Sequence, residues 1–262
     1  MAARIVSFDI ESSPSLAWVW KRFKENISLD QVEADGYVLC GAWKWLGERE
    51  THCVANTDFD WLNPTDDEKT VRELWKVFDE ADIIIAHYGS KFDIPLMNAR
   101  FVYYGLPPPS PYKVIDTKEI AGKIFKFPSN KLEGLCRFFG LGSKMKTDFQ
   151  LWKDCMSGKQ SAWKKMVSYC KRDVVKLEKV YLKLRPYMHQ HPNVALIGEL
   201  TDKPHCPKCG STHIQWRGKK VYRTSTQIYS AFQCMKCGGW ARGLRSLLSK
   251  DSRKNLLAGC GQ

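Results

Sequence analysis

The sequence predicts an α/β domain followed by a small metal-binding module, and three observations support this fold class. Apolar residues alternate along some segments and recur at helical spacing along others within the first 187 residues. The chain has 262 residues, of which 44% are hydrophobic, so it can form one large core and a small appendage. Four cysteines in two Cys-x2-Cys pairs near the C-terminal end predict the appended module.

Five segments are predicted to be strands: 3–12, 37–46, 50–56, 83–86 and 112–116. In the first, Val6, Phe8 and Ile10 alternate with residues of the opposite face, as in a strand. A short turn at Gly47 joins the second and third, so the first three strands are expected to be antiparallel neighbours. The fourth is an unbroken apolar run, which is typical of a strand buried on both faces.

Five further segments carry apolar stripes at helical spacing and are predicted to be helices: 67–80, 93–104, 118–125, 132–139 and 159–186. Gly105 and the proline-rich segment after it end the second of these helices. Pro186 and Pro192 bracket the next change in pattern, which predicts a linker after the long last helix.

The net charge of +13 is concentrated near the C-terminal end, where residues 201–262 hold twelve Lys and Arg against two Asp and Glu. Such a basic surface either keeps the protein soluble or contacts a polyanion such as nucleic acid. There is no apolar run of 18 residues, and the N-terminus enters a strand pattern without a signal-peptide pattern. We therefore expect a cytoplasmic protein with no membrane partner, and reduced thiols at the six cysteines outside the two pairs.

Four acidic residues and a tyrosine lie in or beside apolar segments: Asp9, Glu11, Asp93, Asp173 and Tyr169. The Asp-x-Glu spacing places two carboxylates on one face of a strand, where they repel unless cations lie between them. Tyr169 and Asp173 are four apart and share one helix face, at the edge of its apolar stripe. Taken singly, each has a simpler interpretation: a helix cap for Asp93, a core residue for Tyr169, or an ion pair for Asp173.

Together, SFDIES, AHYGSKFDIP and YCKRDV resemble the three exonuclease motifs of the DEDD superfamily in its tyrosine subclass. This group includes DnaQ-like enzymes and the proofreading domains of family B DNA polymerases. The resemblance covers about residues 3–187, and KLEGLCRFFGLGSK and DFQLW are similar to segments of small phage-encoded exonucleases. It implies an RNase H-like mixed sheet flanked by helices and metal-dependent 3′–5′ exonuclease activity on DNA, in a host cytoplasm if the protein is phage-encoded.

The resemblance also implies residue roles. Asp9 would bridge two Mg²⁺ or Mn²⁺ ions, Glu11 and Asp173 would complete one site, Asp93 would serve the other, and Tyr169 would orient water. Tyr88 stands where many relatives have an Asn that helps to hold substrate, and we expect Tyr88 and the nearby Lys91 to bind nucleic acid. Asp116 is expected to be a structural cap or turn residue, and His87 an interior or supporting histidine rather than a catalytic base. An exoribonuclease on the same scaffold and a non-catalytic nucleic-acid-binding protein remain alternatives.

Cys206, Cys209, Cys234 and Cys237 form the two Cys-x2-Cys pairs, with a glycine after each pair that permits a tight turn. Four thiolates at this spacing predict one structural Zn²⁺ in a zinc ribbon, whereas two redox pairs would lack the helix that such a motif needs. His205 and His213 could replace a cysteine, but the set of four is complete without them.

Basic and aromatic residues alternate between the two cysteine pairs: Trp216, Arg217, Lys219, Lys220, Tyr222, Arg223 and Tyr229. This pattern suits a single-stranded nucleic acid, and its alternative is an ordinary polar strand surface. Replication or repair proteins are further expected partners. We predict an exonuclease domain over 1–187, a linker over 188–203, a zinc ribbon over 204–243 and a basic tail over 244–262.

Overall fold

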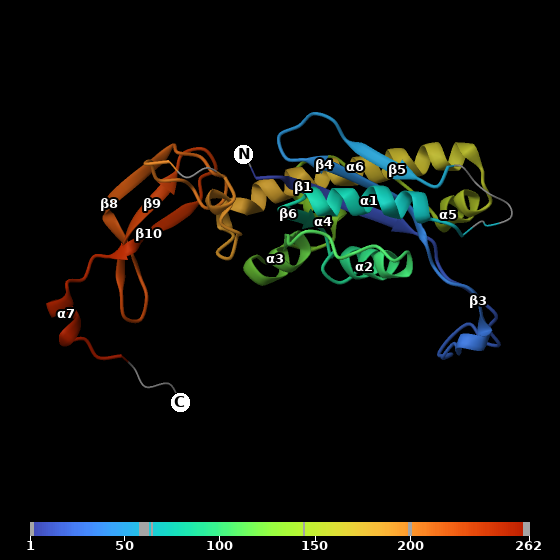
Figure 1. Ribbon diagram of the computed structural model, residues 1–262, viewed down its shortest axis with the longest axis horizontal. Coiled ribbons are helices and arrows are strands. Elements are labelled where there is room, and N and C mark those ends of the chain that lie inside the picture. The colour runs from blue at the N-terminus through green and yellow to red at the C-terminus, as the bar shows by residue number, and fades with distance from the viewer. Residues whose placement is uncertain (1–2, 58–62, 64, 144, 199–200, 259–262) are drawn as a thin grey trace. The chain divides into compact units, whose positions relative to one another are not determined.

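The computed structural model describes residues 3–57, 63, 65–143, 145–198 and 201–258. The chain divides into two compact units, one over residues 4–181 and one over Ala3 and the described residues from 182 onward (Figure 1). Nine cysteines within the described residues are free thiols, whereas Cys260 lies outside these residues.

The larger unit is built on a five-stranded mixed sheet in the order β5-β4-β1-β6-β7. Its strands are β1 (Ile5–Ser12), β4 (Val38–Trp45), β5 (His52–Ala55), β6 (Ile83–Ala86) and β7 (Lys113–Asp116). β1, β4 and β5 pair antiparallel, while β1, β6 and β7 pair parallel. The mixed α/β fold and the antiparallel pairing of the first three predicted strands are confirmed.

Helices cover both faces of this sheet. They are α1 (Glu68–Glu80), α2 (Asp93–Tyr103), α3 (Thr117–Ile124), α4 (Leu132–Phe138), α5 (Phe149–Met156) and α6 (Gln160–Leu184). Phe8 and Ile10 of β1 pack with α1 and α2, whereas Leu39 and Ala42 of β4 pack with α5 and α6. Figure 1 shows α1 and α6 on the two sides of β1 and β4.

The segment between β1 and β4 forms a small hairpin of its own. Its strands are β2 (Leu16–Ala17) and β3 (Val32–Ala34), and a short 3-10 helix over Leu29–Gln31 precedes β3. No strand or helix was predicted for these residues. In Figure 1 the hairpin projects beyond the helices of the larger unit, where it is labelled β3.

The smaller unit contains a three-stranded antiparallel sheet in the order β10-β9-β8. Its elements are β8 (Ile214–Arg223), β9 (Ile228–Cys234), β10 (Trp240–Ser246) and the short helix α7 (Lys250–Lys254). Within the segment predicted as a linker, Met188 is buried and the backbone N–H of Val194 donates to the carbonyl of Pro207 at 2.8 Å. No helix in the described part of the chain is both long enough and apolar enough to cross a membrane.

Candidate active site and cysteine centre

Asp9 and Glu11 lie near the carboxyl end of β1, the central strand of the sheet. Both side chains are half-buried, and their backbones pair with Ala42 and Cys40 of β4. Phe8 and Ile10 occupy the other face of the strand, in the core with α1 and α2. Because side chains alternate along a strand, the two carboxylates share the face that α5 and α6 cover.

Asp93 is the first residue of α2 and is almost fully buried. Its Oδ1 accepts a hydrogen bond from the backbone N–H of Ile10 at 3.1 Å. The parallel ladder between β1 and β6 includes Ser7 but does not extend to Ile10, so this N–H is left to the carboxylate. Asp93 therefore touches β1 between Asp9 and Glu11, across 83 residues of sequence.

Burial raises the pKa of Asp93 to about 6, although the hydrogen bond from Ile10 opposes this shift and the charge of Asp116 adds to it. A carboxylate with a raised pKa is energetically unfavourable in its ionised form, and a nearby cation would relieve that cost. A buried carboxyl group with a raised pKa is of the kind that functional sites contain.

The helix α6 reaches the same end of β1 through Cys170. The Cys170 thiol lies 3.6 Å from the backbone oxygen of Asp9 and 4.0 Å from its carboxylate Oδ2. Tyr169 precedes this cysteine and Asp173 follows one turn later, and both side chains are buried. The ring of Tyr169 packs edge-on against Trp152 of α5, with centroids 6.2 Å apart.

The pKa of the Cys170 thiol is raised well above its usual value, first by hydrogen bonds with Cys40 and Cys53, then by burial and by the charge of Asp9 among others. The pKa of the buried Cys40 thiol is raised as well. The buried thiol of Cys170 anchors α6 to the sheet beside Asp9.

Carboxylate oxygens at this end of the sheet are not tightly clustered. Among the described residues, no three acidic side chains have oxygens that all lie within 4.8 Å of one another. Two metal ions in a nuclease lie about 3.5–4 Å apart, so ligands on opposite sides of such a pair are spread more widely than that. Asp9, Glu11 and Asp173 were predicted at one ion, however, and their oxygens do not form such a compact cluster in this structure.

Asp116 has a structural role, as predicted. It is the N-cap of α3, where its Oδ1 accepts from the backbone N–H groups of Lys118 and Glu119 at 2.9 and 3.2 Å. The same carboxylate accepts from the backbone N–H groups of Tyr88 and Ser90 at 3.0 and 3.1 Å. Asp116 therefore fixes the loop that leads into α2 and Asp93.

His87 and Tyr88 belong to the same loop. The Nδ1 of His87 lies 2.9 Å from the hydroxyl oxygen of Thr117, which suits a supporting role. Tyr88 has φ of +70°, a left-handed conformation that Asn adopts more readily than Tyr. Its ring is exposed, with the Nζ of Lys118 3.4 Å from the centroid, and Lys91 is exposed nearby.

In the smaller unit, the thiols of Cys206, Cys209, Cys234 and Cys237 all lie within 4.8 Å of one another. The pairs Cys206–Cys237 and Cys209–Cys234 are each separated by 3.6 Å. Zn–S bonds of about 2.3 Å in a tetrahedron give sulfur separations of about 3.8 Å, so this cluster is compatible with a zinc ion.

The backbone around the thiols has the turns that a zinc knuckle requires. Gly210 and Gly238 have φ of +70° and +75°, and their N–H groups donate to the carbonyls of Cys206 and Cys234 at 2.9 Å. Both ring nitrogens of His205 are near other partners, at 2.9 Å from Thr201 and 3.1 Å from the carbonyl of Gly210. The four cysteines are therefore sufficient without this histidine.

The predicted nucleic-acid contacts of the smaller unit lie on β8. The β8–β9 register shifts between Trp216 and Val221, so Arg217, Lys219 and Lys220 fall in an irregular bulge. Arg217 donates to Oε1 of Gln233 at 2.6 Å, whereas Lys219, Lys220 and Arg223 are exposed.

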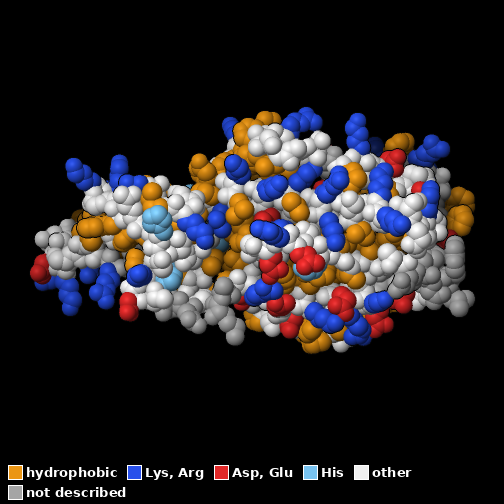
Figure 2. Space-filling model, turned by 90° about the horizontal axis from the view of Figure 1, so that it is seen from above, with side chains coloured by type: hydrophobic (Ala, Val, Ile, Leu, Met, Phe, Trp, Pro, Cys, Tyr) orange, Lys and Arg blue, Asp and Glu red, His pale blue; other side chains and the backbone are white. Residues whose placement is uncertain are grey.

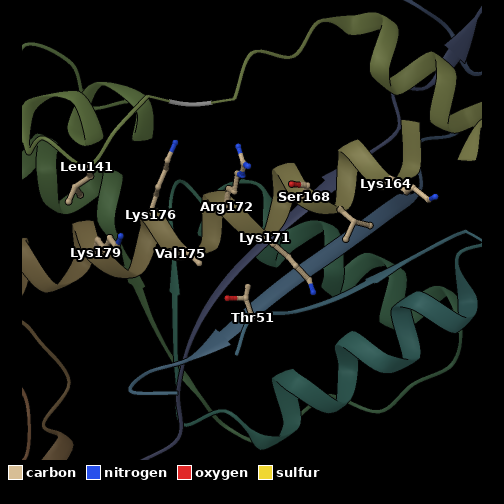
Figure 3. A pocket seen from close by; sticks show the side chains of 10 residues that line it. Thr51, Leu141, Lys164, Ser168, Lys171, Arg172, Val175, Lys176 and Lys179 are labelled. Atoms are coloured by element: carbon tan, nitrogen blue, oxygen red, sulfur yellow. The ribbon is translucent and has the colours of Figure 1, made fainter. Parts of the chain in front are cut away.

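A basic groove on the outer face of α6 was not predicted. It encloses about 570 Å³, and its lining within the described residues includes no Asp or Glu. Five cations line it: Lys164, Lys171, Arg172, Lys176 and Lys179. Figure 3 shows Lys171 on the side of Thr51 and Lys176 on the opposite side of the helix, near Leu141. These five cations recur along the predicted helix on the side away from its apolar stripe, so the sequence could have predicted this basic face.

Lys and Arg side chains are spread widely over one side of the larger unit, while Asp and Glu gather toward one border (Figure 2). The basic groove of α6 belongs to the helix that also carries Asp173 and Tyr169. The groove lies on the outer face of this helix, whereas the side chains of Tyr169 and Asp173 are buried.

A family model for the RNase_H superfamily matches residues 29–185, which is more than half of the chain. The chain belongs to the RNase H superfamily. The matched range contains Asp93, Tyr169 and Asp173, whereas Asp9 and Glu11 precede it.

The chain is also similar to parts of two DNA polymerases. It is 35% identical over 88 residues to the DNA polymerase III PolC-type of Ureaplasma parvum serovar 3, an alignment that covers 32% of this chain and 6% of that protein. A solved structure of the family B DNA polymerase from the hyperthermophilic archaeon Pyrobaculum calidifontis is 15% identical, with a TM-score of 0.48, over 70% of this chain and 26% of that one. The chain therefore spans a small part of either protein.

Proposed function

We propose that this protein is a metal-dependent nuclease that removes nucleotides from the 3′ ends of DNA. The observation that supports this most strongly is the convergence on one end of β1. Asp93 binds the backbone between Asp9 and Glu11, and Cys170 brings the helix with Tyr169 and Asp173 against Asp9. The first residue of α2 and the part of α6 that carries Tyr169 and Asp173 thus both contact β1 near its carboxyl end.

The acidic residues fit a pair of hard divalent cations, because carboxylate oxygens are the ligands that Mg²⁺ and Mn²⁺ prefer. Asp9 would be shared, Glu11 and Asp173 would complete one site, and Asp93 would serve the other. When bound, such ions lower the pKa of water and offset the charge that develops on the leaving oxygen. The raised pKa of Asp93, caused mainly by burial, supports a role beside positive charge.

Tyr169 would orient the attacking water through its hydroxyl group. Its ring is buried against Trp152, which fixes the direction of the phenol. A buried and packed ring loses little further freedom when substrate binds, so the hydroxyl would be held in place before the reaction begins.

The cysteine centre would hold one structural Zn²⁺ that stabilises the smaller unit. Lys208 is buried beside the cluster, and its Nζ donates to the carbonyl of Pro186 at 2.5 Å. A lysine at this point would partly offset the charge of four thiolates. With the exposed cations of β8, the zinc-bound unit would grip nucleic acid or a replication or repair protein.

The basic groove of α6 offers five cations, which suits the phosphate backbone of either nucleic acid. One observation supports DNA as the polymer. The relative from Ureaplasma parvum is a DNA polymerase, although the alignment covers only 6% of its length.

The proposal is tested with single-stranded DNA and RNA of one sequence, labelled at either end, in Mg²⁺, in Mn²⁺ and without either ion. We expect stepwise shortening from the 3′ end of DNA only when an ion is added. Asp173→Asn should lose more than about 100-fold in rate, since even partners that merely support a metal ligand cost 10–100-fold. Glu73→Gln, an exposed carboxylate of α1, is the matched control and should retain full activity.

Shortening of RNA alone would reassign the substrate to RNA. An absence of hydrolysis in either ion, together with tight binding of both polymers, would instead favour a non-catalytic binding protein. Full activity in Asp173→Asn would overturn the site itself.

A further inference from the structure

The β2–β3 hairpin, which we take as residues 13–36, exposes large apolar side chains to an unusual extent. Trp18 is 74% exposed, Trp20 91%, Phe23 83% and Leu29 93%. Isolated apolar residues are common on protein surfaces, but several large ones together mark a site of interaction. The core of the larger unit does not use these rings.

The hairpin is held by hydrogen bonds among its own backbone and side-chain groups. The N–H of Trp18 donates to the carbonyl of Gln31 at 2.9 Å, and Nε2 of Gln31 returns a bond to the carbonyl of Trp18 at 2.9 Å. The carboxylate of Glu25 accepts from the N–H groups of Trp20 and Lys21 at 3.1 and 2.6 Å. The rings are thus presented from an ordered loop, so less entropy is lost when they bind a ligand.

The base of the hairpin is attached next to the candidate catalytic residues. The N–H of Ser13 donates to the carbonyl of Tyr37 at 2.9 Å, and the N–H of Tyr37 donates to Oγ of Ser13 at 2.9 Å. Glu11 pairs with Cys40 just beyond this closure. Trp18 is seven residues after Glu11, so an extended chain places it at most about 25 Å away. A short strand of nucleotides can span that distance.

Cations alternate with the rings along the hairpin. Lys21, Arg22 and Lys24 are exposed and flank Trp20 and Phe23 in the sequence WKRFK. The acid that directly follows them, Glu25, is engaged with the backbone, whereas the other acids of the hairpin, Asp30, Glu33 and Asp35, lie further along the chain. Aromatic faces stack on bases and cations meet phosphates, a combination that binds single strands, because a duplex hides the faces of its bases.

We propose that this hairpin is a stacking platform for the unpaired bases of a nucleic-acid strand whose end lies at the acidic residues. The platform would hold the substrate of the proposed nuclease, so this assignment rests on the proposed function. Rings hold the bases, Lys and Arg hold the backbone, and the strand is steered toward the carboxyl end of β1.

The test measures binding of a labelled 20-nucleotide oligothymidylate by fluorescence anisotropy, with Asp173→Asn as the parent so that the strand is not shortened. Trp18→Ala/Trp20→Ala should bind at least about tenfold more weakly, since stacking contributes strongly at each base. Leu29→Ala is the matched control, equally exposed in the same hairpin but without a ring, and should change affinity less than twofold. An abasic strand of equal length should bind the parent and the double variant alike.

Equal binding of oligothymidylate by the parent and the double variant would overturn the platform. An equal loss with Leu29→Ala, or a loss that extends to the abasic strand, would also overturn it and would indicate a general apolar surface. If the double variant fails to fold by circular dichroism, Trp20→Leu replaces it, and the same outcomes apply. Base-dependent binding without any hydrolysis would refute the nuclease function yet retain the platform, so the two failures are distinguishable.

Discussion

Replacing Asp93 with asparagine should stabilise the metal-free protein above pH 6 while removing its activity. Burial raises the folded-state pKa of Asp93 to about 6, against an ordinary value near 3.9 in the unfolded chain. The ionised carboxylate therefore costs the folded state up to about 3 kcal/mol, at 1.36 kcal/mol for each pKa unit, once the pH exceeds 6. Asparagine keeps an oxygen that can accept from Ile10 and carries no charge.

The sign of this effect follows from the raised pKa. As pH rises from about 4 to about 6, the unfolded chain releases the Asp93 proton first, so the parent protein loses stability over this range. Asp93→Asn lacks that loss, so the two proteins should differ little at pH 4. At pH 8 the variant should have a Tm higher by on the order of 5–10 °C.

The assay is thermal unfolding by circular dichroism at several pH values, in buffer without added Mg²⁺ or Mn²⁺, with hydrolysis of DNA measured in parallel. Asp116→Ala is the control, because it removes a helix cap with four backbone donors and should lower the Tm. A variant that is less stable than the parent at pH 8 would show that burial does not strain the ionised Asp93. A variant that remains fully active would show that Asp93 is not needed for hydrolysis.

Three further outcomes are expected. Cys209→Ser should lower the zinc content of the purified protein, measured by atomic absorption, and should open the smaller unit to proteolysis; unchanged zinc would contradict the cysteine centre. Lys171→Glu/Arg172→Glu should weaken DNA binding, as titrations at several salt concentrations would measure. The slope of the logarithm of the binding constant against the logarithm of salt concentration should fall by about one for each phosphate that is no longer neutralised. Lys76→Glu on α1 is the control and should change neither quantity. Asp67→Ala should cost about 3–5 kcal/mol in urea unfolding, because it leaves the partly buried Arg100 without its partner; a cost below about 1 kcal/mol would show that the pair matters little.

Much of the fold followed from the pattern of apolar residues. The long last helix was predicted over 159–186 and spans Gln160–Leu184, because Trp163, Met166 and Val174 recur on one face. The turn at Gly47, with φ of +93°, allows the antiparallel connection that was expected between the second and third strands. The short helix α5 was missed because only Leu151 and Cys155 of its eight residues are buried.

Less of the candidate site than of the fold could be predicted from the sequence. The acidic residues were selected by resemblance and by their apolar surroundings, but the bond from Ile10 to Asp93 joins residues 83 apart and depends on how β1 and β6 diverge. The contact between Cys170 and Asp9 likewise needs α6 to be packed on the sheet. The aromatic hairpin follows neither a strand nor a helix period, so its rings gave no structural signal.

The proposed pair of metal ions can be observed by anomalous diffraction from crystals grown with Mn²⁺. We predict two manganese peaks about 4 Å apart at the carboxyl end of β1, ligated by Asp9, Glu11, Asp93 and Asp173. Crystals without manganese there, with these carboxylates paired instead to lysine or arginine side chains, would contradict the proposed site.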